Sequence, residues 1–333
     1  KGLGSRDAST EGHEHVIVVG RNFGSVAEDR ARGRIVNNGT YTGVKYKDVF
    51  IASNCHVHKD HVEINCTTNQ GVGKDLVWTV YVEHQKSKIA TTSYHQPIID
   101  GIVDLAGKRQ GAVTEGTTDG GQRIQLHGRN FGAPNTAYLE KVTYGRSGVE
   151  YDATANCSVQ THRQIDCVSQ PGVGADLKWF VTVQGLTSQI STTTTTYAPP
   201  NITMIYPSTG VTQGGDILRI DGVNFGLPDP SAYTQIIFDG QRLDPVRSAI
   251  GAPNAAMGGQ RNHSVWFQVP QFPGQGLNKQ VFIVTGQAPL GGAEQKSDPV
   301  IFNYLPPELD KVSTFEGTRN GQVRLVIDGL NFR

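Results

Sequence analysis

The 333-residue chain has few charged side chains, and those it has cancel. Asp, Glu, Lys and Arg make up 18% of the residues, against about 25% in typical soluble domains, and 30 basic residues balance 30 acidic ones. A formal net charge of zero excludes the strongly basic surface with which most nucleic-acid-binding proteins hold phosphates. We therefore expect no nucleic-acid partner.

Long hydrophobic runs are also missing. No stretch approaches the about 20 consecutive apolar residues that a membrane-spanning helix needs, so we expect no membrane contact within these residues. The first ten residues are polar and contain no apolar signal core. We expect any secretory signal to have been removed or to lie outside this segment.

Sequence signatures of catalysis are absent as well. The chain contains no nucleophile elbow, P-loop, H-E-x-x-H motif or EF-hand loop. Its carboxylates are scattered, so no acid–base pair is indicated by spacing. We predict a protein that is not an enzyme and uses no cofactor.

What the chain does have is glycine and internal repetition. It contains 40 glycines among its 333 residues, a fraction well above the about 7% of average proteins. The motif Gly-x-Asn-Phe occurs four times at intervals of about 100 residues, the size of one β-sandwich domain. The glycine, asparagine and phenylalanine of the four copies are Gly20, Asn22 and Phe23; Gly128, Asn130 and Phe131; Gly222, Asn224 and Phe225; and Gly329, Asn331 and Phe332.

The residues before each motif predict a strand. Apolar side chains stand four and two positions before the glycine, such as Ile124 and Leu126 in the second copy and Leu218 and Ile220 in the third. Residues two apart lie on one face of a strand, so each motif ends a half-buried strand. We expect the Gly and Asn to form a turn with left-handed dihedrals and the Phe to cover the end of a sandwich.

A second repeated feature is a Gly-x-Gly turn followed by a strand. The three copies of the turn are residues 71–73, 172–174 and 274–276. Trp78, Trp179 and Val281 each fall five positions after the second glycine, and apolar residues alternate from there. This spacing predicts a strand whose inner face is apolar.

Proline-containing segments suggest where the repeats end. They lie at residues 94–97, 197–200 and 304–307, and adjacent prolines favour a stiff, extended link. We predict repeats at 1–97, 98–198 and 199–305 and the start of a fourth at 306–333, in a rod-like array. The first repeat is expected to be incomplete at its N-terminal end, and the fourth to be truncated after its second strand at most.

The order of these motifs resembles the IPT/TIG domain, an immunoglobulin-like fold found in plexins, hepatocyte-growth-factor-type receptors and Rel-type transcription factors. The third repeat gives the fullest match, with an opening I-x-P-x-x-G at 205–210, Gly214-Gly215, the Asn-Phe motif at 220–226 and a proline–glycine turn at 273–276. The resemblance implies an all-β chain of tandem immunoglobulin-like sandwiches with a binding or scaffolding role.

The chain also departs from the family pattern. The first repeat has no clear opening motif and has Gln70 where the family turn has proline. The third repeat has no cysteines and carries a Gly/Ala-rich insert near residues 251–259.

The four cysteines form two pairs by position. Cys55 and Cys66 precede the first Gly-x-Gly turn, and Cys157 and Cys167 precede the second. We expect each pair to lie on neighbouring strands joined by a short hairpin and to form a disulfide, which implies an oxidising compartment. The alternatives are two reduced, buried thiols in each repeat or a zinc site, although the spacing is not C-x-x-C.

Glycosylation sequons suggest a secreted glycoprotein. They occur at Asn38, Asn65, Asn156, Asn201 and Asn262. Two of them directly precede a cysteine, so a disulfide would hinder their modification. The Ser/Thr run at 191–196 is either an O-glycan site or, as we prefer, a Thr-rich edge strand.

Two polar clusters are weaker candidates. His56, His58 and His61, with Glu63 nearby, could bind zinc or copper. The second repeat lacks the first two histidines, so a solvated hairpin without metal is the preferred interpretation. The Arg-rich residues 30–34 could contact an acidic partner, but neighbouring acidic residues favour an exposed loop.

These patterns favour an extracellular or cell-surface structural protein whose partners are other copies of itself in a filament or surface layer. The main alternative is a plexin-like adhesion or receptor ectodomain that binds a protein ligand. A glycan-binding accessory domain of a carbohydrate-active enzyme and a Rel-type DNA-binding domain are further alternatives.

Overall fold

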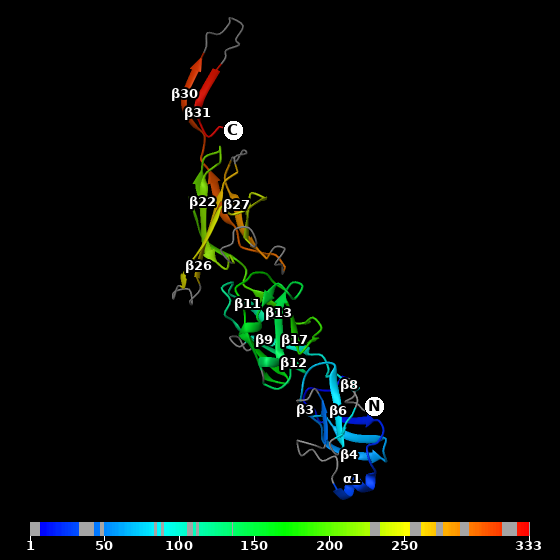
Figure 1. Ribbon diagram of the computed structural model, residues 1–333. Coiled ribbons are helices and arrows are strands. Elements are labelled where there is room, and N and C mark those ends of the chain that lie inside the picture. Colours follow the sequence, from blue (N-terminus) through cyan, green and yellow to red (C-terminus); the bar gives the residue numbers. More distant parts are fainter. Residues whose placement is uncertain are drawn as a thin grey trace. The chain divides into compact units, whose positions relative to one another are not determined.

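The computed structural model describes residues 7–32, 43–46, 50–82, 85–87, 90–104, 109–110, 113–134, 136–226, 234–253, 261–270, 276–286, 293–314 and 325–332 (Figure 1). Within these ranges the protein is all-β, as predicted, with one α-helix and two short 3-10 helices. The helices are α1 (Val26–Arg32), η2 (Thr136–Tyr138) and η3 (Thr154–Asn156). None of the helices in the described part of the chain has the length and apolarity to cross a membrane.

The chain divides into two compact units that interleave along the sequence. The first unit contains residues 1–113, 121–170 and 177–195. The second contains residues 114–120, 171–176 and 196–333. The second unit therefore includes two short segments that come from the residues of the second predicted repeat.

The first predicted repeat forms two antiparallel sheets in the first unit. One contains, in spatial order, β1 (His15–Val19), β5 (Glu63–Thr67) and β4 (Ser53–Lys59). The other contains β3 (Phe50–Ile51), β2 (Gly43–Tyr46), β6 (Leu76–Val82) and β7 (Gln85–Lys86), with β8 (Ala90–Thr92) also paired to β6.

The second predicted repeat has the same two layers. Its first sheet runs β10 (Arg109–Gln110), β9 (Ile98–Asp104), β12 (Arg123–Arg129), β16 (Gln164–Val168) and β15 (Cys157–Thr161). Its second runs β14 (Tyr151–Asp152), β13 (Leu139–Gly145), β17 (Lys178–Val183) and β18 (Leu186–Thr187). A small separate sheet pairs β11 (Val113–Gly116) with β19 (Thr195–Tyr197).

The third predicted repeat lies in the second unit. One sheet runs β20 (Asn201–Tyr206), β22 (Ile217–Val223), β26 (Arg261–Gln268) and β25 (Arg247–Pro253). The other runs β21 (Thr209–Gly210), β29 (Val300–Tyr304), β27 (Lys279–Thr285), β23 (Thr234–Phe238) and β24 (Gln241–Leu243), with β28 (Gln295–Lys296) paired to β27. Residues after 305 contribute the hairpin of β30 (Glu308–Thr314) and β31 (Leu325–Leu330).

Alternating residues of the motif strands build the cores, as the sequence predicts. Ile124 and Leu126 of β12 and Leu218 and Ile220 of β22 are buried. In the β30–β31 hairpin the corresponding Leu325 is 56% exposed, because no second sheet covers it in the described residues.

The strands after the Gly-x-Gly turns supply the facing side of each core. Trp78, Trp179 and Val281 are buried there, which confirms the predicted inner face. Each indole nitrogen donates a hydrogen bond to a threonine hydroxyl, Trp78 Nε1 to Thr92 Oγ1 at 2.6 Å and Trp179 Nε1 to Thr195 Oγ1 at 3.0 Å. A buried indole N–H needs such a partner, so the tryptophans fix the position of the last strand.

The first three residues of the Arg-rich segment, which was expected to be a loop, are helical instead. Residues 30–32 belong to α1, although residues 33 and 34 and the three side chains lie outside the described part of the chain. Ser25 caps the helix, because its Oγ accepts a hydrogen bond from Glu28 N at 3.2 Å, and Asp60 Oδ1 accepts one from Val26 N at 2.7 Å. These caps satisfy backbone groups that would otherwise disfavour the helix.

The repeat boundaries at residues 97, 198 and 305 stay a prediction. The compact units divide the chain at other places, as the assignment of residues 114–120 and 171–176 shows. The Gly/Ala-rich insert lies largely outside the described residues.

Candidate functional site

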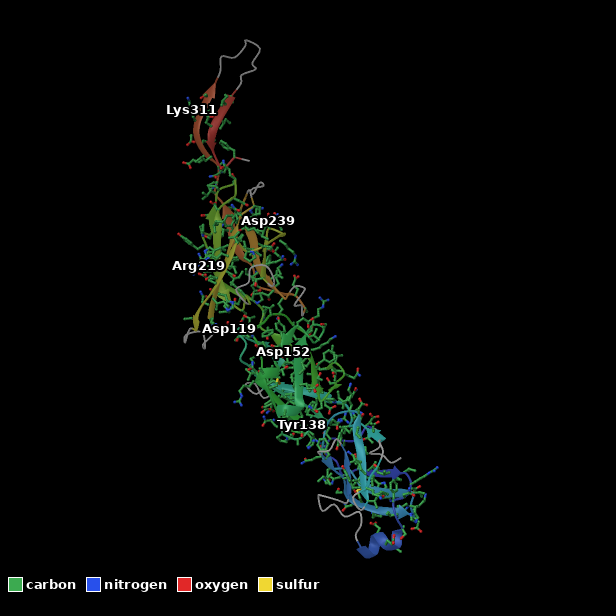
Figure 2. The ribbon with its side chains drawn as sticks, in the orientation of Figure 1. Asp119, Tyr138, Asp152, Arg219, Asp239 and Lys311 are labelled. Atoms are coloured by element: carbon green, nitrogen blue, oxygen red, sulfur yellow. A yellow bond between two sulfur atoms is a disulfide. The ribbon has the colours of Figure 1, made fainter. Side chains whose placement is uncertain are left out.

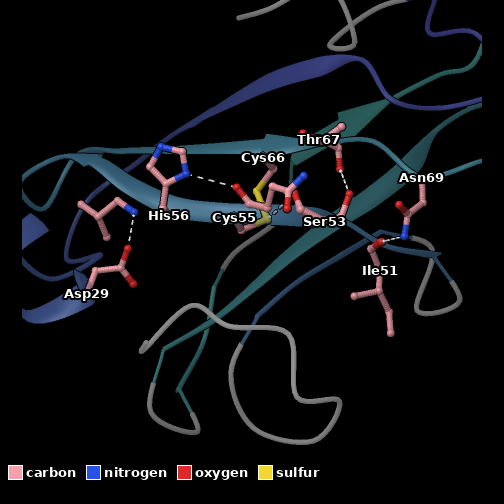
Figure 3. The surroundings of a disulfide bond; sticks show 10 residues. Asp29, Ile51, Ser53, Cys55, His56, Cys66, Thr67 and Asn69 are labelled. Atoms are coloured by element: carbon pink, nitrogen blue, oxygen red, sulfur yellow. Dashed lines mark hydrogen bonds between the residues drawn. A yellow bond between two sulfur atoms is a disulfide. The ribbon is translucent and has the colours of Figure 1, made fainter. Parts of the chain in front are cut away.

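Both predicted disulfides are present. Cys55 of β4 is bonded to Cys66 of β5, and Cys157 of β15 to Cys167 of β16 (Figure 3 shows the first). Each links neighbouring strands of a hairpin. In the third repeat, buried Phe267 occupies the position of Cys167, because each is paired with the residue four before the motif glycine. An aromatic core residue replaces the disulfide there.

The described sequons differ in exposure. Asn156 and Asn201 are exposed, whereas Asn65 and Asn262 are half-buried. The Asn65 Oδ1 atom is buried and has no hydrogen-bond partner among the described residues. Asn38 lies outside the described residues.

The Ser/Thr run at 191–196 is partly internal. Ser191 Oγ accepts a hydrogen bond from Trp179 N, and Thr195 accepts the indole bond described above. Both residues are buried, and only the end of the run belongs to strand β19. The predicted edge strand is therefore shorter than expected.

The histidine cluster is not assembled into a metal site. His56, His58 and His61 are all exposed, and His56 Nδ1 lies 3.1 Å from the Asn54 carbonyl oxygen. Among the described residues no group of three or more His, Cys, Asp or Glu side chains is placed to hold a metal ion.

The asparagines of the Gly-x-Asn-Phe motif adopt the expected left-handed conformation. The φ angles of Asn22, Asn130, Asn224 and Asn331 are 65°, 64°, 61° and 58°. The phenylalanine rings of the first three copies are buried, as the sequence suggested.

The motif glycine has a different role from the one expected. Gly128 and Gly222 do not have positive φ angles. Instead, a Cβ atom at Gly128 would lie 2.6 Å from Phe131 Cζ, and one at Gly222 would lie 2.5 Å from Phe225 Cζ. The expectation of a left-handed glycine is therefore wrong, because the ring folds back onto the glycine and leaves no space for a side chain.

The second motif contacts the loop near residue 10, within the first unit. The side-chain oxygen of Asn130 accepts a hydrogen bond from Thr10 N at 3.3 Å, and its Nδ2 donates one to the Gln96 carbonyl at 3.4 Å. His162 Nδ1 lies 2.9 Å from Thr10 Oγ1, and Arg163 Nε donates to Glu11 Oε1 at 2.7 Å. We call this set the first junction cluster.

The third motif makes matching contacts within the second unit. Thr118 N donates to Asn224 Oδ1 at 3.4 Å. His263 Nε2 lies 3.2 Å from Asp119 Oδ1, and Phe225 N donates to His263 Nδ1 at 3.2 Å (Asp119 is labelled in Figure 2). We call this set the second junction cluster.

An apolar contact completes both clusters. A Cβ atom at Gly132 would lie 2.5 Å from Val72 Cγ1, and one at Gly226 would lie 2.5 Å from Val173 Cγ1. The two valines are the middle residues of the first two Gly-x-Gly turns, and both are buried. The two motifs found by sequence repetition therefore meet each other, twice and with the same partners.

Burial favours the neutral form of both junction histidines. Burial lowers the pKa of His263, and Asp119 opposes that shift only in part. Since Phe225 N donates to Nδ1, the proton of the neutral ring is on Nε2, facing Asp119. Burial also lowers the pKa of His162.

The charged pair of the first cluster is more exposed. A hydrogen bond from Arg163 lowers the pKa of the Glu11 carboxyl. Because both side chains are largely in solvent, we expect this pair to add orientation and little stability.

The fourth motif makes some of the contacts found in the two junction clusters. Asn331 Nδ2 donates to the Pro306 carbonyl at 3.1 Å, and Thr212 Oγ1 donates to the Phe332 carbonyl at 3.3 Å. Thr10, Thr118 and Thr212 each precede a glycine by two positions, a weak T-x-G repeat that sequence reasoning missed. It also missed that His61, His162 and His263 are evenly spaced.

Comparison with known proteins identifies the third repeat. Residues 200–298 match the family model of the IPT/TIG domain. No curated protein matches the chain in sequence.

Several solved structures of extracellular proteins are similar at low identity. The plexin A4 extracellular region is 11% identical with a TM-score of 0.25, covering 92% of this chain and 33% of that one. Mouse nectin-like molecule 4 is 12% identical with a TM-score of 0.25, covering 66% of this chain and 76% of that one. The Escherichia coli adhesin FdeC is 11% identical with a TM-score of 0.20, covering 90% of this chain and 94% of that one.

This chain thus spans about a third of the length of the plexin A4 chain that it resembles. The sheets of the chain agree with tandem immunoglobulin-like domains. Residues 200–298 are an IPT/TIG domain.

Proposed function

We propose that the chain is a segment of a non-catalytic, extracellular structural glycoprotein whose tandem IPT/TIG repeats self-assemble into a filament or surface layer. The carrying observation is the repeated junction, in which the same threonine, valine, asparagine and glycine positions meet in both clusters. Such a contact joins two different surfaces head to tail. A heterologous contact that does not close builds an open filament.

Covalent features support an extracellular setting. Two disulfides persist most readily in an oxidising environment. The sequon residue Asn201 is exposed, as a glycan acceptor must be, whereas the Cys157–Cys167 disulfide next to exposed Asn156 would hinder its modification.

A surface row on the third repeat supports contact with other proteins. Tyr206, Arg219, Trp266 and Arg247 face one another across the four strands of the β20–β22–β26–β25 sheet. The two guanidinium groups lie 5.4 and 4.6 Å from the Trp266 ring centre, and Tyr206 is 69% exposed. Tyrosine, tryptophan and arginine are enriched at the centres of protein interfaces.

Electron microscopy of the purified, undenatured protein tests the proposal. Regular filaments or sheets with a constant axial repeat are expected. Dispersed single particles at high concentration would contradict self-assembly and would instead support a receptor or adhesion ectodomain of the plexin kind.

A matched pair of variants makes the test sharper. If the aromatic row takes part in packing, Tyr206→Ser should weaken assembly measured by light scattering. Gln125 lies on the polar outer face of the corresponding sheet in the second repeat, so Gln125→Ser should leave assembly unchanged.

A further inference from the structure

The first repeat contains the same Asn-Phe-Gly turn as the second and third repeats. Asn22 has the same left-handed backbone as Asn130 and Asn224, and Gly24 has a φ of 90° against 88° and 89° for Gly132 and Gly226. The Phe23 ring is buried beneath them. The backbone at this end is therefore shaped like the ends that form the two junction clusters.

A histidine also stands at the matching place. Phe23 N donates to the His61 carbonyl at 3.2 Å, just as Phe131 N donates to the His162 carbonyl at 3.0 Å. His162 is the residue whose ring meets Thr10 in the first junction cluster. His61 is thus the first-repeat counterpart of a contact residue.

In contrast to the other two, this surface is open among the described residues. Within that part of the chain no atom outside its chain neighbours lies within 4 Å of a Cβ position at Gly24, where Gly132 and Gly226 each meet a valine. The Asn22 side chain is exposed, whereas Asn224 is only 7% exposed. We call Asn22, Phe23, Gly24 and His61 the open receiving face.

We propose that the open receiving face binds the tip of another repeat of the same kind, linked ahead of Lys1 in the same polypeptide. The two junction clusters define what that tip must offer. It needs a T-x-G loop whose threonine N–H meets Asn22 Oδ1, as in both clusters. It also needs a polar side chain to meet His61, as Thr10 meets His162 in the first cluster and Asp119 meets His263 in the second. It also needs a valine between two glycines to cover Gly24.

A second copy of this chain fits less well as the occupant. Its Thr10 and Thr118 already contact Asn130 and Asn224, and its Thr212 contacts the carbonyl of Phe332. The matching loops of the described chain are thus in use. The proposal rests on the tandem-array part of the proposed function and is independent of filament formation.

An extended chain tests the proposal. Ala8 pairs with Tyr94 as Gly210 pairs with Tyr304, so residue 202 corresponds to the position just before Lys1. A copy of residues 98–202 joined directly to Lys1 therefore keeps the natural linker and register. It places a copy of Val173 next to Gly24.

Paired cysteines report the contact. Val173→Cys in the added repeat, combined with Gly24→Cys, is expected to form a disulfide detected by mass spectrometry of unreduced peptides. The positive control is Val173→Cys with Gly226→Cys in the original chain, where the Cβ atoms would lie 3.9 Å apart. Val149→Cys in the added repeat replaces Val173→Cys as the negative control, because that side chain is exposed elsewhere.

The outcomes separate clearly. A positive control that forms while the Gly24 pair stays reduced overturns the proposal. If the cysteine variant fails to fold, hydrogen exchange of the backbone amides of residues 22–25 is measured in the extended chain without the added cysteines. The proposal predicts exchange about tenfold slower, or more, than in the unextended chain, and unchanged rates overturn it. Slow exchange of these amides in the unextended chain at high concentration would instead identify a second molecule as the occupant and overturn the linked repeat.

Discussion

The glycine of the Gly-x-Asn-Phe motif lies directly against the ring of the phenylalanine three residues later, so a side chain at the glycine position would clash with the ring. At Gly128 an added Cβ would meet both the Phe131 ring and the Ile98 carbonyl oxygen of the neighbouring strand. Neither can move without disturbing the core or a strand pair. This explains why the motif keeps glycine although its φ angle is ordinary.

Gly128→Ala is therefore expected to destabilise the protein by roughly 1–3 kcal/mol, the usual range for overpacking. Chemical denaturation followed by tryptophan fluorescence measures the change. Gly101→Ala is the matched control, because a Cβ at Gly101 meets nothing within 4 Å. Equal effects of the two substitutions would contradict the steric explanation.

The second junction cluster should weaken on mild acidification. Burial lowers the pKa of His263 in the folded protein, so the unfolded chain binds a proton more readily. The stability that depends on neutral His263 is then present above about pH 6.5, the ordinary histidine pKa, and is lost as pH falls below it. Protonation of Nδ1 would also remove the acceptor used by Phe225 N.

The pH dependence can be assigned with two variants. Asp119 and Arg261 are the charged groups acting on this ring, and both remain in His263→Gln. That variant should show a smaller loss of unfolding free energy between pH 7 and 5 than the unmodified protein. An equal loss of unfolding free energy in His263→Gln and the unmodified protein would refute the assignment to His263. The variant His162→Gln measures how much of the pH-dependent loss comes from the first junction cluster.

Local residue conformations were readable from the sequence, but distant contacts were not. An asparagine between two glycines, each two positions away, indicates a left-handed turn, which Asn130 and Asn224 confirm. The partner of His162 is Thr10, 152 residues away, and no periodic pattern encodes that distance. The junction residues became visible only when the fold brought the two motifs together.

At the scale of strands and hairpins, the repeats stabilise the same place in different ways. The second repeat uses the Cys157–Cys167 disulfide, whereas the third packs Phe267 against Phe238 with ring centres 5.9 Å apart. The hairpins of the first two repeats therefore depend on redox conditions, and that of the third does not.

Reduction should affect the repeats selectively. Replacing both Cys157 and Cys167 with serine is expected to cost about 2–4 kcal/mol in the stability of the second repeat, since the cross-link no longer restricts the unfolded chain. Amide exchange measured repeat by repeat should show faster opening of β15 and β16 while β25 and β26 are unchanged. Equal acceleration in the third repeat would contradict this division.

Strands were easier to predict than the helix and the last strand of each sandwich. Period-two alternation before the motif glycines identified β12 and β22 directly. Helix α1 depends on hydrogen bonds that its first N–H groups donate to Ser25 and to Asp60, which is distant in sequence. Burial of Ser191 depends on Trp179, so the Ser/Thr run alone could not reveal it.

At the scale of the whole molecule, one kind of junction occurs more than once. The valine of a Gly-x-Gly turn meets the glycine after Asn-Phe in both clusters, each within one compact unit. The family match covers only residues 200–298, so the common junction is independent evidence that the other repeats belong to the same array.

Engineered disulfides test this claim most directly. At both junctions a Cβ on the glycine would lie 3.9 Å from the valine Cβ, within the range that a disulfide spans. Two double variants, Val72→Cys with Gly132→Cys and Val173→Cys with Gly226→Cys, are oxidised in air and mapped by mass spectrometry. We expect the new cross-link in both variants beside the two natural disulfides, whereas its formation in neither, or in only one, would contradict a repeated junction.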